Sequence, residues 1–186
     1  MGITINYEGR LKNQESLDEL INKAISLAKT FRWNYRTIDL PENFFVHVKD
    51  VHVHEYSSPA RGICIIPSDH CEAIKLIFDK DLYMSQFTKT SFAGPLVHKR
   101  VVEFLRLVEP LIKDFEVNDE TNYWKTKSDE ILYSGFYPLY VKNLKKLRVC
   151  KKLRNKIMKH FAEHELFLIR LKNFDRALNL NSSVTT

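Results

Sequence analysis

The fold of this chain depends on residues 85–124, which read SQFTKTSFAGPLVHKRVVEFLRLVEPLIKDFEVNDETNYW. A hydroxyl-rich loop leads into Pro95, which suits the first turn of a helix because its missing N–H would be unbonded there anyway. Apolar residues then recur at helical spacing. This pattern predicts a helix from Leu96 to about Phe115, with a kink or an early stop at Pro110. An acidic and aromatic turn follows the helix.

Alternating apolar runs before this stretch predict strands joined by turns. The first strand begins at Ile3, and an apolar stripe after it predicts one helix. A second strand from Tyr35 is expected to stop at Pro41, because proline cannot donate a ladder hydrogen bond. Further strands are expected at residues 44–54 with a break near 49–50, 61–66, 72–78, 82–87 and 115–117. This order predicts an α+β fold, in which helices pack on one face of an antiparallel sheet built from a strand, a helix and a strand meander.

The C-terminal part differs from the rest, because from Leu139 onward it contains no Gly or Pro and carries an apolar stripe at three-to-four spacing. Unbroken, about 40 helical residues would span about 60 Å, twice the width of a small domain. We therefore expect a kinked helix or a helical hairpin, or a stripe that is exposed to a partner. The expected organisation is an α+β domain at 1–135, a basic helical extension at 136–178 and a flexible tail at 179–186.

Composition excludes several classes of protein. A hydrophobic fraction of 44% is ordinary for a globular protein and excludes wholesale disorder. The chain has three cysteines, an odd number, which favours a reducing compartment over a disulfide framework. It opens directly on a strand pattern without a basic leader, so we expect no signal peptide. No run of about 18 uncharged apolar residues is present. We expect a cytoplasmic protein that does not contact a membrane.

The loop before the main helix suggests an anion site. The first turn of a helix has unpaired N–H groups and a partial positive charge, and basic side chains lie beside it in the sequence. The alternative is that Thr90 and Ser91 only cap the helix. The absence of a Gly-rich phosphate loop from the sequence favours this alternative. The candidate anion-binding residues are Thr88, Lys89, Thr90, Ser91 and His98.

A catalytic site would combine the main helix with the acidic turn that follows it. His98 is the candidate general acid or base, with Asp119 or Glu120 as its carboxylate partner. About 20 residues lie between them, which is about 30 Å of helical rise. The two side chains can therefore meet only if the acidic turn folds back towards the start of the helix. Adjacent carboxylates beside aromatic residues also form a solvated turn more often than a catalytic site.

Two short histidine spacings are typical of metal ligands. His52 and His54 would share one face of a strand, and His160 and His164 would share one face of a helix. Motifs this short arise by chance, and the second pair lies in basic surroundings. We therefore expect no metal and no cofactor.

Positive charge is concentrated in residues 142–159, which include nine basic residues and no acidic one. Because the whole chain carries +6 and this window +9, the remainder carries −3. Such segregation is typical of proteins that bind nucleic acid or another anionic surface. The alternative is a helix that lies on an acidic patch of the same or another subunit. The candidate partner-binding residues are Lys145, Lys146, Arg148, Lys151, Lys152 and Arg154, with Tyr123 and Trp124.

Two motifs together resemble a known family. They are Lys-Thr-x-Phe-Ala-Gly-Pro-x-x-His at residues 89–98 and Glu-Val-x-Asp-Glu-x-x-Tyr-Trp-x-Thr at residues 116–126. The pair resembles an uncharacterised family of small bacterial cytoplasmic proteins, and the resemblance implies a bacterial source without an assigned activity. Ser91 stands where family members tend to have Gln, and the basic extension is longer in this chain.

These observations favour a non-enzymatic binding or interaction protein, of immunity or regulatory type, that has a protein partner or associates with itself. No nucleotide-binding loop or coherent catalytic triad is present in the sequence. One alternative is an enzyme that acts on an anionic substrate at residues 86–100. The other is a nucleic-acid-binding protein that uses residues 142–159.

Overall fold

The computed structural model describes residues 2–49 and 52–147. The chain divides into two compact units, Met1–Leu139 and Tyr140–Thr186, and the first unit holds the sheets and the candidate site. The elements run in the order β1 (Thr4–Arg10), α1 (Gln14–Phe31), β2 (Asn34–Lys49), β3 (His52–Ile66), β4 (Ile74–Phe78), β5 (Tyr83–Lys89), α2 (Pro95–Val108), the 3-10 helix η1 (Glu109–Leu111), β6 (Lys113–Asp119), α3 (Tyr123–Thr126) and α4 (Asp129–Leu147).

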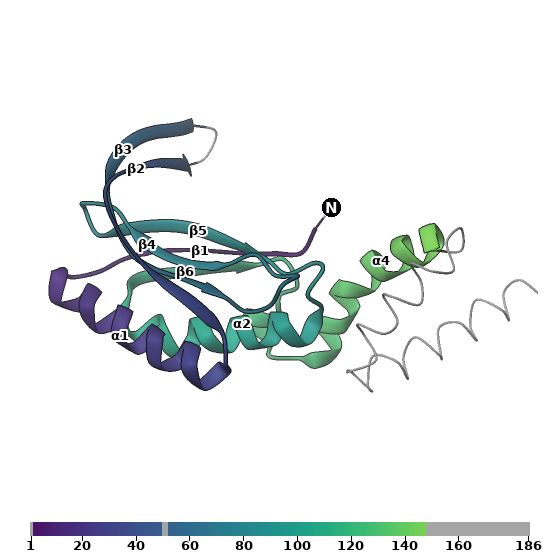
Figure 1. Ribbon diagram of the computed structural model, residues 1–186. Helices are drawn as coiled ribbons and strands as arrows, with labels where there is room; N and C mark the ends of the chain where they lie inside the picture. The colour runs from purple at the N-terminus through teal and green to yellow at the C-terminus, as the bar shows by residue number, and fades with distance from the viewer. Residues whose placement is uncertain (1, 50–51, 148–186) are drawn as a thin grey trace, which may run out of the picture. The chain divides into compact units, whose positions relative to one another are not determined.

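The described strands form two antiparallel sheets, with the orders β5-β1-β6 and β2-β3-β4. β1 is central in the first sheet, where Ile5 pairs with Thr88 of β5 and with Asp119 of β6. A tight turn joins β4 to β5, and in it the N–H of Asp79 donates to the carbonyl of Tyr83 at 3.0 Å. α1 and α2 lie along one side of the strands (Figure 1). The predicted α+β fold is confirmed.

The core is apolar because helices and strands each bring one apolar face to it. On β1, buried Ile5 and Tyr7 alternate with less buried neighbours, as the period of a strand requires. On α2, Val101, Phe104 and Leu105 recur at helical spacing and are fully buried. α1 adds its buried stripe of Leu17, Leu20, Ala24 and Ala28.

α2 is shorter than the sequence predicts. It begins at Pro95, in the first turn, and ends at Val108 instead of near Phe115. Pro110 explains the early stop, because a proline ring clashes with the preceding helical turn and has no N–H to donate. After η1 the backbone of Ile112 is already extended (φ −112°, ψ 123°). The residues expected in the last helical turn therefore begin β6.

The stop predicted at Pro41 is wrong, and so is the separation of residues 51–54 from the strand expected at 61–66, whereas the break expected near 49–50 is where β2 ends. β2 runs through Pro41, and β3 is one strand from His52 to Ile66. Pro41 is tolerated because β2 lies at the edge of its sheet, where an N–H can be absent without loss of a ladder bond. The pairing with β3 also shifts register between Leu40 and Asn43, which places the proline at an irregularity.

Beyond this irregularity the two strands form an arm, residues 43–49 and 52–58, that extends away from α1 and α2 (Figure 1). Phe45 and Tyr56 stack across the arm, with ring centroids 5.5 Å apart. The Tyr56 hydroxyl donates to Asp79 Oδ2 at 2.5 Å, and Ser58 Oγ accepts the N–H of Lys80 at 3.0 Å. These contacts attach the base of the arm to the β4–β5 turn.

Two helices follow β6. α3 ends at Thr126, because Lys127 adopts a left-handed conformation (φ 52°), and α4 begins at Asp129. α4 runs across the expected domain boundary at residue 135 and includes Pro138. The remainder of the predicted extension after Leu147, and the predicted tail at 179–186, lie outside the described residues.

Candidate functional site

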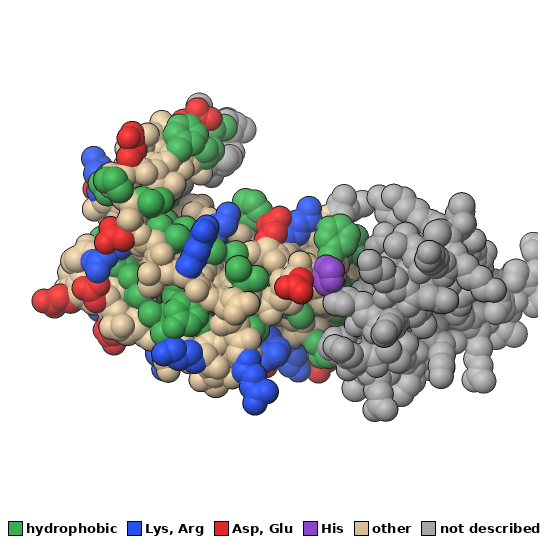
Figure 2. All heavy atoms as spheres, viewed as in Figure 1, with side chains coloured by type: hydrophobic (Ala, Val, Ile, Leu, Met, Phe, Trp, Pro, Cys, Tyr) green, Lys and Arg blue, Asp and Glu red, His purple; other side chains and the backbone are tan. Residues whose placement is uncertain are grey.

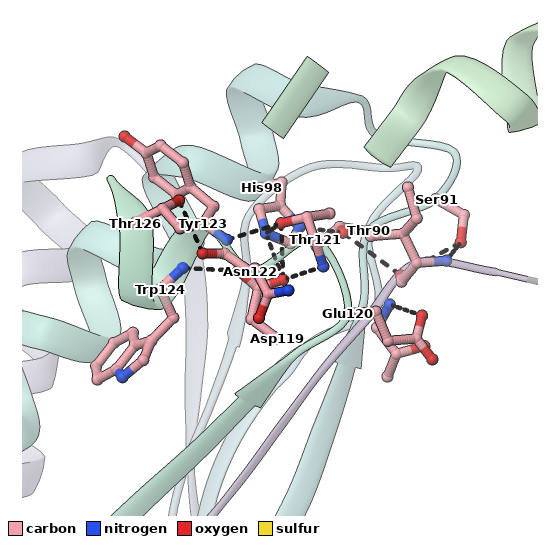
Figure 3. A network of polar contacts seen from close by, with 12 residues as sticks. Thr90, Ser91, His98, Asp119, Glu120, Thr121, Asn122, Tyr123, Trp124 and Thr126 are labelled. Carbon is pink, nitrogen blue, oxygen red and sulfur yellow. Dashed lines mark hydrogen bonds and ion pairs between the residues drawn. The ribbon is translucent and has the colours of Figure 1, made fainter. Parts of the chain in front are cut away.

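His98 is the centre of a buried polar network (Figure 3). It lies in the second turn of α2, and its side chain is 0% exposed. Its Nδ1 lies 2.8 Å from Thr90 Oγ1. Its Nε2 lies 3.1 Å from Thr121 Oγ1 and 3.2 Å from Asp119 Oδ1. Each ring nitrogen therefore has a partner, and the partners come from opposite ends of the 85–124 stretch.

β1 brings these partners together because β5 pairs on one side of it and β6 on the other. Thr90 follows the end of β5 and donates its N–H to the carbonyl of Ile3 at 2.9 Å. Asp119 is the last residue of β6 and pairs with Ile5. Since β6 runs back along the sheet after α2, the acidic turn folds back onto His98. The separation of about 30 Å expected from helical rise is therefore wrong.

Asp119 accepts hydrogen bonds on both carboxylate oxygens. Oδ1 accepts from the N–H and the hydroxyl of Thr121, each at 2.8 Å, and Oδ2 accepts from the N–H of Trp124 at 2.8 Å. Burial by itself raises the pKa of Asp119, but the hydrogen bond and charge of His98 and the donated backbone N–H groups outweigh it. The net effect lowers the pKa of Asp119 to about 2. The carboxylate is therefore ionised at neutral pH.

The direction of each hydrogen bond in the network follows from Thr121. Its hydroxyl donates to Asp119 Oδ1, so its oxygen accepts from Nε2–H of His98. In a neutral imidazole with Nε2 protonated, Nδ1 accepts the hydroxyl proton of Thr90. In the imidazolium, Nδ1 donates to Thr90, whose hydroxyl lies 3.5 Å from the carbonyl of Ile3. The network thus provides partners for both protonation states of His98.

The network is closed to solvent. The ring of Phe136 meets the imidazole of His98 edge-on at a centroid distance of 5.5 Å. Gly135 lies so close to Thr121 that a Cβ there would be 3.2 Å from Thr121 Cγ2. A histidine and a carboxylate can exchange a proton with a substrate only where the substrate reaches them. His98 is fully buried, and its contact with Asp119 joins α2 to the end of β6.

The candidate anion-binding hydroxyls also point into the protein. Thr88 Oγ1 lies 3.1 Å from the Tyr7 hydroxyl, Thr90 bonds His98, and Ser91 Oγ accepts the N–H of Ile3 at 2.6 Å. Lys89 is the one candidate in this loop whose side chain is only half-buried. The alternative role as a side-chain helix cap is wrong, because the N-cap of α2 is Gly94 and no side chain bonds there. The hydroxyls instead fasten the loop to β1.

Glu120 and the aromatic residues after it are divided between different environments. Glu120 lies away from His98 (Figure 3), and its Oε2 accepts the N–H of Thr4 at 2.9 Å. Tyr123 is buried. Trp124 is half-buried, and the guanidinium of Arg106 lies 4.2 Å from the centroid of its ring. Only Asp119 of the two candidate carboxylates therefore joins the His98 network.

Sequence reasoning missed Thr121, the residue that connects His98 and Asp119. The signal was present as Asp-x-Thr at residues 119–121, since an Asp side chain commonly accepts the N–H two residues later in a turn. The turn forms here, and the N–H of Asn122 also donates to the carbonyl of Asp119 at 2.8 Å. What the pattern does not reveal is that His98 reaches the same turn.

The remaining candidates lie apart from this network or beyond the described chain. His54 pairs in register with His47 on the arm, and among the described residues no group of three His, Cys, Asp or Glu side chains is placed to hold a metal ion. Lys145 and Lys146 belong to the described backbone of α4. The candidates that lie outside the described residues are Arg148, Lys151, Lys152, Arg154, His160 and His164.

Comparisons of the chain with models of protein families, with curated proteins and with solved structures returned no match. Within residues 2–49 and 52–147, no helix is long and apolar enough to cross a membrane.

Proposed function

We propose that this chain is a non-enzymatic binding protein of immunity or regulatory type, which contacts a macromolecular partner in the bacterial cytoplasm through its arm. The observation that carries the proposal is a row of apolar side chains left in solvent on the arm. Phe44 is 60% exposed, Val46 48% and Val53 58%. Apolar side chains gathered in this way mark interaction surfaces more often than apolar residues scattered singly.

Strand register places these side chains on one face. Phe44 pairs with Ser57 and Val46 pairs with Glu55. Val53 pairs with residue 48, which is two positions after Val46 on β2. Side chains directly opposite each other in an antiparallel pair point to the same face. Phe45 and Tyr56 occupy the other face, where they stack and where Tyr56 bonds Asp79. The arm is therefore fastened on one face and free to bind on the other, and Figure 2 shows apolar side chains on the arm.

The closed His98 network favours binding over catalysis. His98 and Asp119 are the acid–base pair that an enzyme would use, yet the imidazole is 0% exposed. The polar groups of the loop are hydrogen bonded within the protein, which supports a structural role for them.

Photo-crosslinking in living cells tests the proposal. A photoreactive phenylalanine analogue at Phe44 is expected to give one discrete crosslinked product, and the product should weaken when Val53 is changed to Ser. The same analogue at Leu107, which is 46% exposed on α2, is the matched control. Equal products from both positions, or none from Phe44, would count against the arm as a binding surface.

A second candidate function is nucleic-acid binding through residues 142–159. The segregation of nine basic residues in this window supports it, because phosphate contacts dominate affinity for nucleic acids. Its test is the salt dependence of binding argued in the Discussion.

A further inference from the structure

We propose that the partner of the arm is a second copy of this chain, joined edge to edge through β2 residues 43–49 in an antiparallel ladder. This inference rests on the proposed function, since it requires the arm to be a binding surface. It adds the identity of the partner, the strand used and the register.

The first argument is that the arm has an open strand edge. β2 is the outer strand in the order β2-β3-β4, so alternate N–H and C=O groups of β2 point away from β3 and have no strand beside them in the described residues. Proteins normally block such edges with proline, charge or a bulge. Pro41 and the register shift block the edge only before Asn43.

The second argument is the composition of the open edge. Residues 43–49 read NFFVHVK, with no proline and with one Lys at the end. Aromatic and β-branched residues favour extended pairing. A segment of this length, with high strand propensity and little charge, is a template for another strand of the same kind.

The third argument is that the segment is complementary to itself. Two copies related by a twofold axis pair antiparallel and bury the same residues on both sides, so the contact closes as a dimer. With Val46 on the axis, Phe44 lies opposite the second copy's residue 48, and Asn43 lies opposite its residue 49. No two like charges are then directly opposed within residues 43–49. A shift of the pairing by one residue would place the exposed face of one copy, with Phe44 and Val46, on the same side as the Phe45 face of the other copy.

The fourth argument sets the strength of the contact. Three exposed apolar side chains provide less than the ~800 Å² per partner of a standard interface. The ladder must therefore contribute the rest, and the dimer is a concentration-dependent one. The arm extends away from α1 and α2, so these two helices do not cover it (Figure 1).

Disulfide trapping tests the register. Cys71 and Cys150 are first changed to Ser, while Cys64 is buried and is kept. In the proposed ladder, Val46 and its copy have Cα atoms about 5 Å apart. Val53 and its copy are separated by three strand spacings across the sheet and by four residues along the strands, about 20 Å in all. A disulfide needs Cα atoms within about 7 Å.

We expect Val46→Cys to give a disulfide-linked dimer under mild oxidation and Val53→Cys, at similar exposure on the same face, to give little. Strong trapping at Val53 would show face-to-face packing and overturn the edge ladder. Sedimentation of the unmodified chain provides the second measurement. We expect a monomer–dimer equilibrium that Val46→Lys weakens at least tenfold and Leu107→Lys leaves unchanged.

Sedimentation and photo-crosslinking together separate the two proposals. A chain that stays monomeric at every concentration, yet crosslinks through Phe44 to a different protein in cells, overturns the second copy and keeps the arm as a binding surface. A monomer without that crosslink overturns both.

Discussion

The Nε2 atom of His98 lies 3.2 Å from Oδ1 of Asp119, although the rest of α2, η1 and nearly all of β6 separate the two residues in the chain. This contact fixes the start of a helix to the end of a strand. It depends on β1, which holds β5 and β6 on its two sides.

Removal of His98 should therefore destabilise the protein. His98→Ala removes the imidazole that lies beside Oδ1 of the buried Asp119 carboxylate, and breaking a buried pair on one side costs about 3 kcal/mol or more. Urea denaturation measures the free energy of unfolding. Lys99→Ala is the matched control on α2, because its ion pair with Asp129 is partly exposed and contributes less than about 1 kcal/mol. Similar small losses in both variants would contradict a stabilising role for the network.

Asp119 should make the protein sensitive to acid. Its pKa is about 2 in the folded protein, against about 3.9 in an unfolded chain. Because the folded value is the lower one, the ionised carboxylate stabilises the fold fully above about pH 4, and this stability is lost as the pH falls towards about 2. The loss is about 2 to 3 kcal/mol by linkage.

Unfolding measured at about pH 5 and about pH 2 in the wild type and in Asp119→Asn checks the acid prediction. The variant lacks this titration, so its free energy of unfolding should fall less between the two pH values. An equal fall in both proteins would assign the acid sensitivity to other carboxyls.

Local patterns in the sequence predicted much of the fold. The alternation after Ile3 gives β1, and Pro95 and Pro110 bound α2, because each of these signals acts within a few residues. The arm was missed because Pro41 usually ends a strand, and its tolerance here depends on an edge position that only the assembled sheet provides.

The sequence named Asp119 as a possible partner of His98, but it could not show that the two residues meet. Residues 98 and 119 meet only because β6 pairs with β1 in a specific register, which involves residues more than 100 positions apart. Side-chain spacing along one helix contains no information on that register. The sequence therefore suggested His98 and Asp119 as a pair, while the strand register that brings them together was not predictable from it.

Gly62 should tolerate no side chain. On β3 it passes β4 so closely that a Cβ would lie 1.9 Å from the carbonyl oxygen of Leu76. Gly62→Ala must therefore separate the two strands or shift the ladder, and we expect a loss of about 2 kcal/mol or more in the free energy of unfolding. Ser57→Ala, at an exposed position on the same strand, is the control and should have little effect. A Gly62 variant as stable as this control would contradict the close approach.

Binding of nucleic acid by the basic window, residues 142–159, should depend strongly on salt concentration. Each phosphate neutralised by a Lys or Arg releases counterions, so log affinity falls with log salt by about 0.9 per contact. Five contacts would then lose roughly three orders of magnitude in affinity over a fivefold increase in salt. Fluorescence anisotropy with labelled DNA and RNA at several salt concentrations measures the slope.

Charge removal inside and outside the window decides whether that slope belongs to it. Changing four lysines of the window to Gln should flatten the slope and weaken binding to all nucleic-acid sequences alike, because phosphate contacts carry no sequence information. Removing four charges elsewhere should change the slope little, since the effect depends on local contacts. Absence of salt-sensitive binding to both DNA and RNA would contradict nucleic-acid binding as a function of this chain. A change of oligomeric state in the window variant would instead assign the basic residues to a contact between subunits. The window variant changes Lys145, Lys146, Lys151 and Lys152, and the control variant changes the exposed Lys12, Lys23, Lys29 and Lys75.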